Sequence, residues 1–521
     1  MRLPVILGVI SLAALIVGQA QAGDGIGQIK SGVPSANMKV GTPSNVIDSD
    51  FQLNEIARGT DPLENPSGLI TNFGMLSNGT LTEPDENTYL ILDQNPGGPT
   101  PGFDYGRRFL FQGHENGSPL AYVTRINLDL PRTSPHRVTL LTPVNPMTGT
   151  TGFGSIDGST YNPFTNKMLF TQERGAAGGV IQITLTWPPV INTLDAFLGK
   201  GGYEGIHPDD SGNIYVIEDA GGATSHTPAI NNGRQPNSFV YRYVPNNPAR
   251  IEDGGKLQAL QVIIDGSPVV FGGTATQTQI DADISSTAQL KLHTPGSSYP
   301  VNWVTIHTSM ANDTIGFDAN LAAKTAGATP FKRPENMAWM PESNFGTFFF
   351  DPTGDTDSVA GDNPFLQARG SYGAIFRVDL NKNPEKRGSD GQISLFFLGD
   401  HDHNSFDNLA FANQSQLLAA EDRGDTLHTQ LNTLDSVWAF NVKTSNKPPV
   451  RLIALGRDAN SILHGEDNEP TGLFVSNGDN GTKHLLGTSA NLAGARGFVT
   501  QQHGDNIVYE IVRIRNEQAQ N

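Results

Sequence analysis

One arrangement of acidic residues occurs four times in this chain of 521 residues. Each copy has an acidic residue, a turn, an apolar run and a second acid followed shortly by a glycine. The members of each pair lie 16, 14, 16 and 14 residues apart, and successive copies begin 47, 131 and 72 residues apart. Repeats of this size predict the sheets of a β-propeller with insertions between them. The pairs are Asp157 and Glu173, Glu204 and Glu218, Glu335 and Asp351, and Asp407 and Glu421.

The repeated acids also predict a metal site. The inner strands of a propeller face one axis, so acids at the same place in each sheet converge on a common channel. A ring of like charges is tolerated only around cations, and carboxylates favour hard cations such as Ca²⁺ or Mg²⁺. The ligands that the repeats indicate are Asp157, Glu173, Glu204, Glu218, Glu335, Asp407 and Glu421.

Short β-type runs broken by Gly, Pro, Asn and Asp continue along the rest of the chain. Helical periodicity is scarce, with 194–198 and 319–326 as the best short candidates. We therefore expect an all-β fold in which residues 51–521 form a single β-propeller. Polar, Gly-rich stretches at 220–236, 266–300 and 353–370 are expected to be loop insertions on one face.

The chain begins with the features of a secretory signal. Residues 1–22 hold a basic start, an apolar stretch and a small-residue cleavage site, and they are too short for a lasting membrane anchor. We expect export to the periplasm or out of the cell, and an irregular lead-in over 23–50. No cysteine is present, so stability must come from the core and bound ions rather than from disulfides.

The charge balance limits the kinds of partner that the chain can bind. The chain carries 34 basic and 52 acidic residues, which gives a formal net charge of −18. This excess repels phosphate backbones and anionic membrane surfaces, so we expect no nucleic-acid partner and no stable membrane insertion. A Gly-x-Ser-x-Gly elbow, a His-Glu-x-x-His pair and a phosphate-cradling Gly-Lys-Ser/Thr loop are all missing from the sequence. Serine-hydrolase and nucleoside-triphosphatase functions therefore lose their main support.

The order of several motifs resembles the PhoX family of bacterial alkaline phosphatases. The most specific is Phe331-Lys332-Arg333-Pro334-Glu335-Asn336, which is similar to the family's Arg-Pro-Glu motif. The resemblance extends from Phe51 to the C-terminus and implies a six-bladed propeller whose axial site binds calcium and iron and hydrolyses phosphate esters. It also adds Glu115 and Glu469 to the expected metal ligands. The other motifs are Gly113-His114-Glu115-Asn116, Tyr203-Glu204-Gly205-Ile206-His207, Phe406-Asp407-Asn408-Leu409, Glu469-Pro470-Thr471-Gly472 and Gln501-Gln502-His503-Gly504.

One departure from the family concerns its metal. The family's archetypes hold iron through a cysteine in a Thr-Cys-Glu-Glu stretch, where this chain has Thr171-Gln172-Glu173-Arg174. Without a cysteine, an iron–thiolate bond is impossible. We therefore expect Ca²⁺ as the cofactor, either alone or with a second metal, iron or another, that has no thiolate ligand.

The same motifs supply candidate catalytic residues. A phosphate ester resists attack because its negative charges repel the nucleophile, so catalysis depends on positioning and on neutralising charge. Arg333 is the candidate clamp on the phosphate, two residues from the metal-binding Glu335. His207 and His114 are candidates for proton transfer to a leaving alkoxide, although each also fits an ordinary loop histidine. We take Arg333, Glu335 and His207 as the candidate catalytic set.

The sequence thus predicts an exported, metal-dependent phosphatase, monomeric, that hydrolyses small phosphate monoesters. Two alternatives remain open. One is a lactonase-like propeller hydrolase in which an axial ion polarises a carbonyl, and the other is a non-catalytic binding propeller that calcium stabilises. Arg333 separates these alternatives, because a guanidinium suits a phosphate dianion and has no evident use in a structural ion site.

Overall fold

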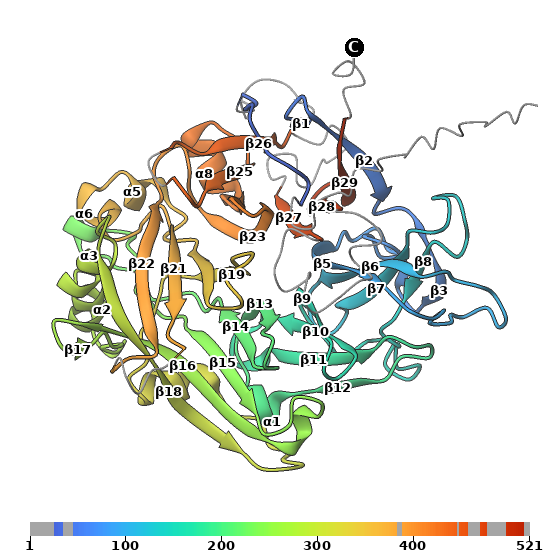
Figure 1. Ribbon diagram of the computed structural model, residues 1–521, viewed down its shortest axis with the longest axis horizontal. Helices are drawn as coiled ribbons and strands as arrows, with labels where there is room; N and C mark the ends of the chain where they lie inside the picture. Colours follow the sequence, from blue (N-terminus) through green and yellow to red (C-terminus); the bar gives the residue numbers. More distant parts are fainter. Residues whose placement is uncertain are drawn as a thin grey trace, which may run out of the picture.

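The computed structural model describes residues 25–34, 45–382, 388–444, 447–456, 469–476 and 496–514. The signal sequence expected at 1–22 lies outside these residues. Within them, no helix is long and apolar enough to cross a membrane. Strands dominate, which confirms the all-β fold, and the sheets stand around a common centre as in a propeller (Figure 1).

Aromatic and branched residues account for the most deeply buried strands. β14 (Ile214–Glu218) and β20 (Thr347–Pro352) are buried at every position. Their side chains favour the pleated backbone. Neither strand alternates between apolar and polar residues, because both faces of each sheet pack against other parts of the ring.

Most of the sheets are antiparallel meanders in which consecutive strands are neighbours. The first comprises β5 (Glu83–Ile91), β6 (Arg108–Glu115), β7 (Tyr122–Asn127) and β8 (Val138–Leu140). The second comprises β9 (Ile156–Asn162), β10 (Lys167–Gln172), β11 (Gly179–Thr184) and β12 (Ile191–Thr193). Near the C-terminus lie β23 (Phe406–Asn413), β24 (Gln416–Glu421), β25 (Ser436–Asn441) and β26 (Val450–Ala454) in one sheet, and β27 (Pro470–Val475), β28 (Gly497–Gln501) and β29 (Ile507–Arg513) in another.

The largest sheet has ten strands. It joins two meanders through the long strand β18 (Ser298–Ser309), which pairs with β16 on one side and β22 on the other. The two-residue β17 (Ser267–Pro268) pairs with β16, and a separate hairpin consists of β3 (Pro62–Ser67) and β4 (Ile70–Asn72). The meanders are β13 (Tyr203–Pro208), β14, β15 (Val240–Pro245) and β16 (Gly255–Ile264), and β19 (Pro334–Trp339), β20, β21 (Ala374–Leu380) and β22 (Gly391–Leu398).

The first strand of each meander faces the centre of the ring. β5 contacts β9, β9 contacts β13 and β13 contacts β19, and the series continues through β23 and β27 back to β5. Figure 1 shows these six strands around the centre of the ring. The core lies in layers between the sheets. For example, Phe111, Ile156 and Phe170 belong to one buried cluster drawn from the first two sheets.

Strands from the two ends of the described chain complete the same sheets. β2 (Phe51–Ala57) pairs antiparallel with β29, and β1 (Val46–Ile47) pairs with β26. Ile26 and Ile29, from the lead-in expected to be irregular, are buried in the cluster of these two sheets. Hydrogen bonds between the beginning and the end of the chain therefore close the ring.

The three insertions contain more regular structure than the expected loops. The 266–300 insertion holds α2 (Gln277–Ile284) and α3 (Thr287–Leu292), and the 353–370 insertion holds α5 (Ser358–Gly361) and α6 (Pro364–Gln367). Local capping explains the first two helices, because the Thr276 and Ser286 side chains accept hydrogen bonds from their first turns.

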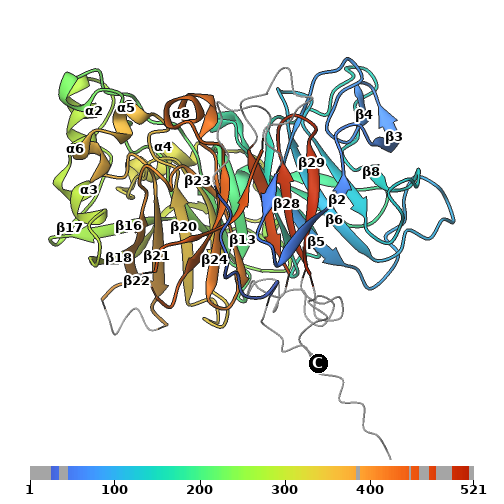
Figure 2. The same cartoon turned by 90° about the horizontal axis from the view of Figure 1, so that it is seen from above.

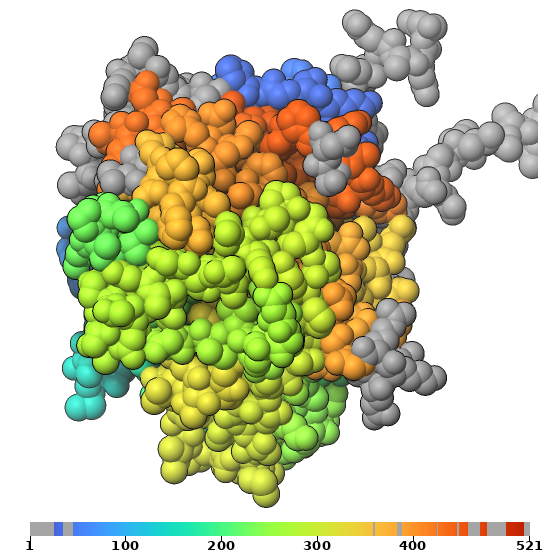
Figure 3. Space-filling model, turned by 90° about the vertical axis from the view of Figure 1, so that its left-hand side faces the viewer, coloured from blue at the N-terminus to red at the C-terminus, as the bar shows by residue number. Residues whose placement is uncertain are grey.

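We call these three insertions the cap. Ile230, Ile284, Ala360 and Leu366, which come from all three, form a small buried core. Figure 2 shows the cap helices grouped at one side of the ring, and Figure 3 shows the same flank with the yellow-green 266–300 segment at the surface. The other α-helices in the described part of the chain are α1 (Asp195–Leu198) and α4 (Ala319–Thr325), which coincide with the expected helical stretches, and α8 (Gly424–Leu431).

Candidate metal centre and active site

Five inner strands have a β-bulge at the position of an acid. In β13 the pairing register shifts between Tyr203 and Ile206, so Glu204 falls within the bulge. A bulge bends the strand and redirects a side chain that would otherwise follow the strand's alternation. The same shift brackets the inner-strand acids Asp85 in β5, Asp157 in β9, Glu335 in β19 and Asp407 in β23.

Glycines after two of these acids let the inner strands approach each other. A Cβ atom on Gly158 would collide with the backbone oxygen of Glu204, and one on Gly205 would lie 2.8 Å from the Cα atom of Asn336. Only glycine fits where one inner strand lies this close to the next. The acid–glycine pairs of the sequence therefore serve both to direct a carboxylate inward and to close the ring.

The inward-facing acids meet in a cavity of about 290 Å³ at the ends of the inner strands. Ten carboxylates line it together with Arg333, Gln502 and His503. The Gln502 side-chain amide donates hydrogen bonds to Asp85 Oδ2 at 2.6 Å and Glu115 Oε1 at 3.2 Å. The acids are Glu83, Asp85, Glu115, Asp157, Glu173, Glu204, Glu335, Asp407, Asp422 and Glu469.

Three overlapping groups of carboxylates have the spacing of metal ligands, with their oxygens within 4.8 Å of one another. Asp157 is shared by the first and second groups, and Glu204 by the second and third. The three centres thus follow one another around the cavity. The groups are Asp85, Glu115 and Asp157; Asp157, Glu173 and Glu204; and Glu204, Asp219 and Glu335.

Burial is the main cause of raised pKa values in this cavity, and repulsion between neighbouring carboxylates adds to it. The pKa of Asp85 rises to about 6 and that of Glu335 to about 7. Such groups keep their protons to a higher pH than ordinary carboxyl groups do unless cations replace them. The pKa values of Glu115, Asp157, Glu173, Glu204 and Asp407 are raised well above their ordinary values.

The donor atoms fit hard divalent cations. Each of the three groups offers only carboxylate oxygens, and Ca²⁺ takes six to eight oxygen ligands in flexible geometry. In the third group Asp219 Oδ1 is buried and accepts no hydrogen bond from the described residues, so it has a lone pair available for an ion. The chain lacks cysteine, and Gln172, where the family has its cysteine, ends β10 beside the cavity-lining Glu173.

Arg333 places one positive group among these acids. Its Nε donates to Asp219 Oδ2 at 2.8 Å, and its Nη2 lies 3.1 Å from Glu335 Oε1. Burial disfavours the charged guanidinium, but these two carboxylates outweigh it and raise the pKa of Arg333 well above its ordinary value. Arg333 also has a φ of 50°, a left-handed conformation that is uncommon for a bulky side chain and often occurs at functional sites.

Seven of the nine expected metal ligands line the cavity, and Glu218 and Glu421 do not. Glu218 accepts hydrogen bonds from the Tyr241 hydroxyl and the Phe239 backbone inside its sheet, and Glu421 pairs with Arg423 at 2.7 Å. Successive side chains of a strand face opposite sides, so the next residue points the other way. Asp219 accordingly joins the third carboxylate group, and Asp422 lines the cavity.

The two histidines considered from the sequence lie away from the cavity lining. Burial lowers the pKa of His207 to about 4, with a hydrogen bond to Asn336 opposing the shift. Burial also lowers the pKa of His114 well below its ordinary value, and its ring stacks on Tyr122. His503 is the histidine that lines the cavity, where its Nε2 lies 3.5 Å from Glu83 Oε1.

Sequence reasoning missed Glu83, Asp85 and Gln502 as site residues. The signal for Asp85 is present, because Asp85-Glu86-Asn87 places an acid and a small polar residue in the first inner strand, as Glu335-Asn336 does later. In the first sheet Asp85 and Glu115 lie 30 residues apart rather than 14 or 16, so this pair does not match the spacing of the other copies.

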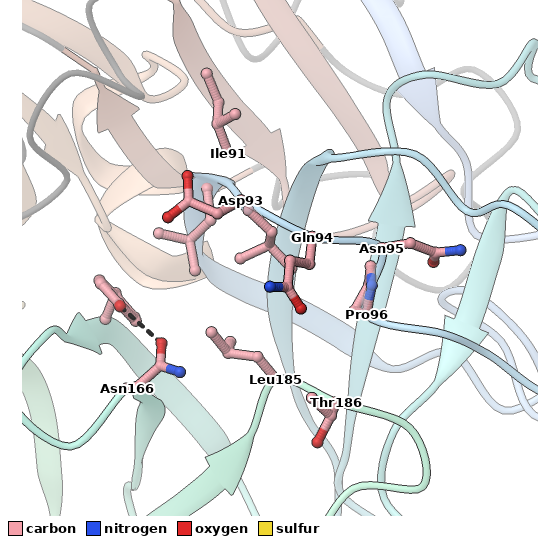
Figure 4. A pocket seen from close by; sticks show the side chains of 11 residues that line it. Ile91, Asp93, Gln94, Asn95, Pro96, Asn166, Leu185 and Thr186 are labelled. Atoms are coloured by element: carbon pink, nitrogen blue, oxygen red, sulfur yellow. Dashed lines mark hydrogen bonds between the residues drawn. The ribbon is translucent and has the colours of Figure 1, made fainter.

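A second hollow lies at the other end of β5. It has a volume of about 450 Å³ and includes Ile91, Asp93, Asn166 and Leu185 in its lining (Figure 4). The Asp93 side chain is 89% exposed and pairs with Arg107, and the Tyr161 hydroxyl donates to Asn166. One exposed acid does not form a metal centre, so the acidic cavity is the better candidate site.

The fold and the cavity define a propeller-like protein in which carboxylate groups that could hold metal ions surround one guanidinium. Residues 213–481 match the model of the alkaline phosphatase PhoX family. This chain belongs to the PhoX family of alkaline phosphatases and is a phosphoric ester hydrolase. A comparison with curated proteins gives no match.

The solved structure of one PhoX protein has the same overall fold. This chain is 13% identical to Pseudomonas fluorescens PhoX in complex with vanadate, a transition state analogue, with a TM-score of 0.56 over 93% of this chain and 97% of that one. A putative 6-phosphogluconolactonase from Bacteroides uniformis is 13% identical, with a TM-score of 0.31 over 71% and 97% of the two chains. TolB from Acinetobacter baumannii is 8% identical, with a TM-score of 0.30 over 82% and 63%.

Proposed function

We propose that this chain hydrolyses phosphate monoesters in the acidic cavity, with Ca²⁺ as the main cofactor. The observation that carries the proposal is the combination of three linked carboxylate groups with the guanidinium of Arg333 in one cavity. Carboxylates alone would repel a phosphate dianion, whereas cations and an arginine reverse the local field. The PhoX structure that holds vanadate is consistent with a phosphoryl site in this fold.

The chain's own residues would bind and orient the ester. Arg333 presents a planar fork to two phosphoryl oxygens, and it stays charged at any pH at which the protein is folded. Glu335 and Asp219 hold that fork in place through their 3.1 Å and 2.8 Å contacts. Cations held by the three carboxylate groups would supply Lewis-acid charge that offsets the negative charge of the phosphoryl group.

His207 has no role in this scheme, since it bonds to Asn336 and is not among the residues that line the cavity. Arg333 and Glu335 remain the proposed catalytic residues. Asp157 and Glu204 are the central metal ligands in the proposal because each belongs to two groups. A second metal without a thiolate ligand, iron or another, fits the same carboxylate groups.

Three further features belong to the proposal. Counting the ten-stranded sheet as two meanders on either side of β18 gives a propeller of six blades. The sequence of residues 1–22 supports export to the periplasm or beyond the cell. The protein would act as a monomer, with a small phosphorylated molecule as its substrate.

One protein preparation tests the function. Protein purified without added metal is analysed for its elements and assayed on p-nitrophenyl phosphate, with and without Ca²⁺ after chelation. We expect calcium in the purified protein, loss of turnover on chelation and recovery with Ca²⁺. A folded protein that never turns over a phosphomonoester with any divalent ion would contradict the proposal, and hydrolysis of a lactone by the same sample would favour the lactonase-like alternative.

A further inference from the structure

Lys332, the residue directly before Arg333, forms a buried ion pair with Asp355. The Lys332 ammonium lies 2.9 Å from Asp355 Oδ1 and 3.0 Å from Asp355 Oδ2, and the two side chains are 2% and 0% exposed. A fully buried pair of this kind contributes little net stability, because removing both charges from water costs about as much as their attraction returns. Such a pair is often retained because it fixes a conformation rather than because it stabilises the fold.

The backbone around the pair is bonded to the Arg333 segment. The amide of Thr353 donates to the carbonyl of Arg333 at 2.7 Å, and the amide of Gly354 donates to the carbonyl of Lys332 at 3.2 Å. The two segments are thus held side by side by two backbone hydrogen bonds and by the ion pair that follows them. Arg333 is the residue in this stretch with the left-handed φ of 50°.

Asp355 also connects this segment to the cap. Its Oδ1 accepts a hydrogen bond from the backbone amide of Arg234 at 3.0 Å, and its backbone oxygen accepts one from Arg234 Nε at 3.3 Å. Its own amide donates to the carbonyl of Ser371 at 2.8 Å. One residue therefore joins the 220–236 insertion, the 353–370 insertion and the segment just before β19 that contains Arg333.

We infer that Asp355 is a positioning residue: through its buried ion pair with Lys332 it holds the neighbouring backbone in the left-handed conformation that aims Arg333 into the cavity. A residue with a positive φ relaxes to another conformation unless its surroundings prevent it. Here the adjacent side chain is anchored at both oxygens of Asp355, so the chain cannot rotate at Arg333 without breaking a buried charge pair. This inference rests on the proposed function, in which Arg333 clamps the phosphoryl group.

The test uses a variant that removes the pair without leaving a buried charge. In the double variant Lys332→Met and Asp355→Asn, the apolar thioether replaces the ammonium, and the side-chain carbonyl of the introduced asparagine still accepts from the Arg234 amide. We expect kcat/KM for p-nitrophenyl phosphate to fall about tenfold or more, with calcium content and melting temperature close to those of the parent. The control neutralises the ion pair between Arg496 and Glu510, whose Nε and Oε1 atoms lie 2.6 Å apart. Neither residue lines the cavity, so this variant should keep activity within about twofold.

A double-mutant cycle shows whether the effect passes through Arg333. In an Arg333→Ala background the Lys332→Met, Asp355→Asn change should cost less than about twofold, because the group being positioned is gone. Binding of inorganic phosphate to the calcium-loaded protein, measured by calorimetry, gives the same cycle without turnover.

The outcomes are distinct. A full tenfold loss in the Arg333→Ala background, or parental activity in the double variant, would overturn the positioning role. A parent that neither hydrolyses the ester nor binds phosphate would overturn the proposed function itself, together with the inference that depends on it.

Discussion

The guanidinium of Arg333 donates from Nε to Oδ2 of Asp219 at 2.8 Å, although 114 residues separate them in the sequence. Asp219 also belongs to a carboxylate group with Glu204 and Glu335, and its other oxygen is free of hydrogen bonds from the described residues. The same side chain can therefore orient the arginine with one oxygen and bind a cation with the other. In the proposed function, phosphate binding and metal binding are therefore coupled through Asp219.

Replacing Arg333 by Lys should separate charge from geometry. Lysine keeps the positive charge beside Asp219 and Glu335 but loses the planar fork, so phosphomonoesterase turnover should fall by about two to three orders of magnitude. Calcium content and melting temperature should change little, because a cationic side chain is no metal ligand. Steady-state kinetics on metal-loaded protein measure this, and near-parental turnover would exclude Arg333 as the phosphate clamp.

Removing one shared carboxylate should affect two metal sites at once. In Glu204→Gln, the second and third groups each lose a charged ligand. Calcium affinity should drop by about tenfold or more, since the number of charged ligands tunes it. Equilibrium dialysis with elemental analysis measures this. Asp93→Asn is the control, because its side chain is 89% exposed and lies in the other hollow; equal calcium binding by both variants would argue against the carboxylate centre.

The metal-free protein should lose stability as pH rises from 4.5 to about 7. Burial raises the pKa of Glu335 and of Glu86 from 4.5 to about 7 in the folded chain. Each group keeps its proton when folded and loses it when unfolded, so its contribution is complete below pH 4.5 and is lost as pH passes through 7. Melting temperatures in chelator should follow this trend, and saturating Ca²⁺ should flatten it because the ion binds the ionised carboxylates. A metal-free protein that became more stable over this range would contradict the assignment.

The ring should not survive the loss of its last sheets. A chain ending at Val378 lacks β23, which contacts β19, and β27, which contacts β5. It also lacks β29, with which β2 pairs. Repeated units that share an axis bury their faces against each other and cannot stand alone, so this fragment should aggregate or melt without cooperativity. Circular dichroism on heating tests this; a soluble fragment with a cooperative transition would mean that the described sheets form two independent bodies.

The sequence predicted the acids of the ring better than their orientation. Asp157, Glu204, Glu335 and Asp407 all line the cavity, because a repeat with an acid within a bulge has the same geometry in each sheet. The second acid of a copy was harder to place, since a shift of one residue along a strand reverses its side. Glu173 reaches the cavity after a spacing of 16, whereas after a spacing of 14 Glu218 faces into its sheet and Asp219 takes the ligand position.

Other features depended on contacts that no short pattern contains. The capped helices of the insertions pack on a core of four residues taken from three separate stretches. Gln502 bonds to Asp85 across 417 residues of sequence, and β18 merges two meanders into one sheet. Contacts between residues so far apart cannot be predicted from one sequence, because periodicity and the spacing of acids describe only neighbouring stretches of the chain.

The pairing of β2 with β29 makes the order of the strands circular rather than linear. A chain whose present ends were linked, and which was opened instead in a surface turn between two other sheets, would keep every neighbour in the ring. In the existing order β2 lies near the start of the described chain and its partner β29 near the end. The outer edge of the last sheet is therefore completed only when both strands are present. The acidic cavity draws on strands from both sides of that junction, so its lining is complete only when the first and the last sheets are both in place.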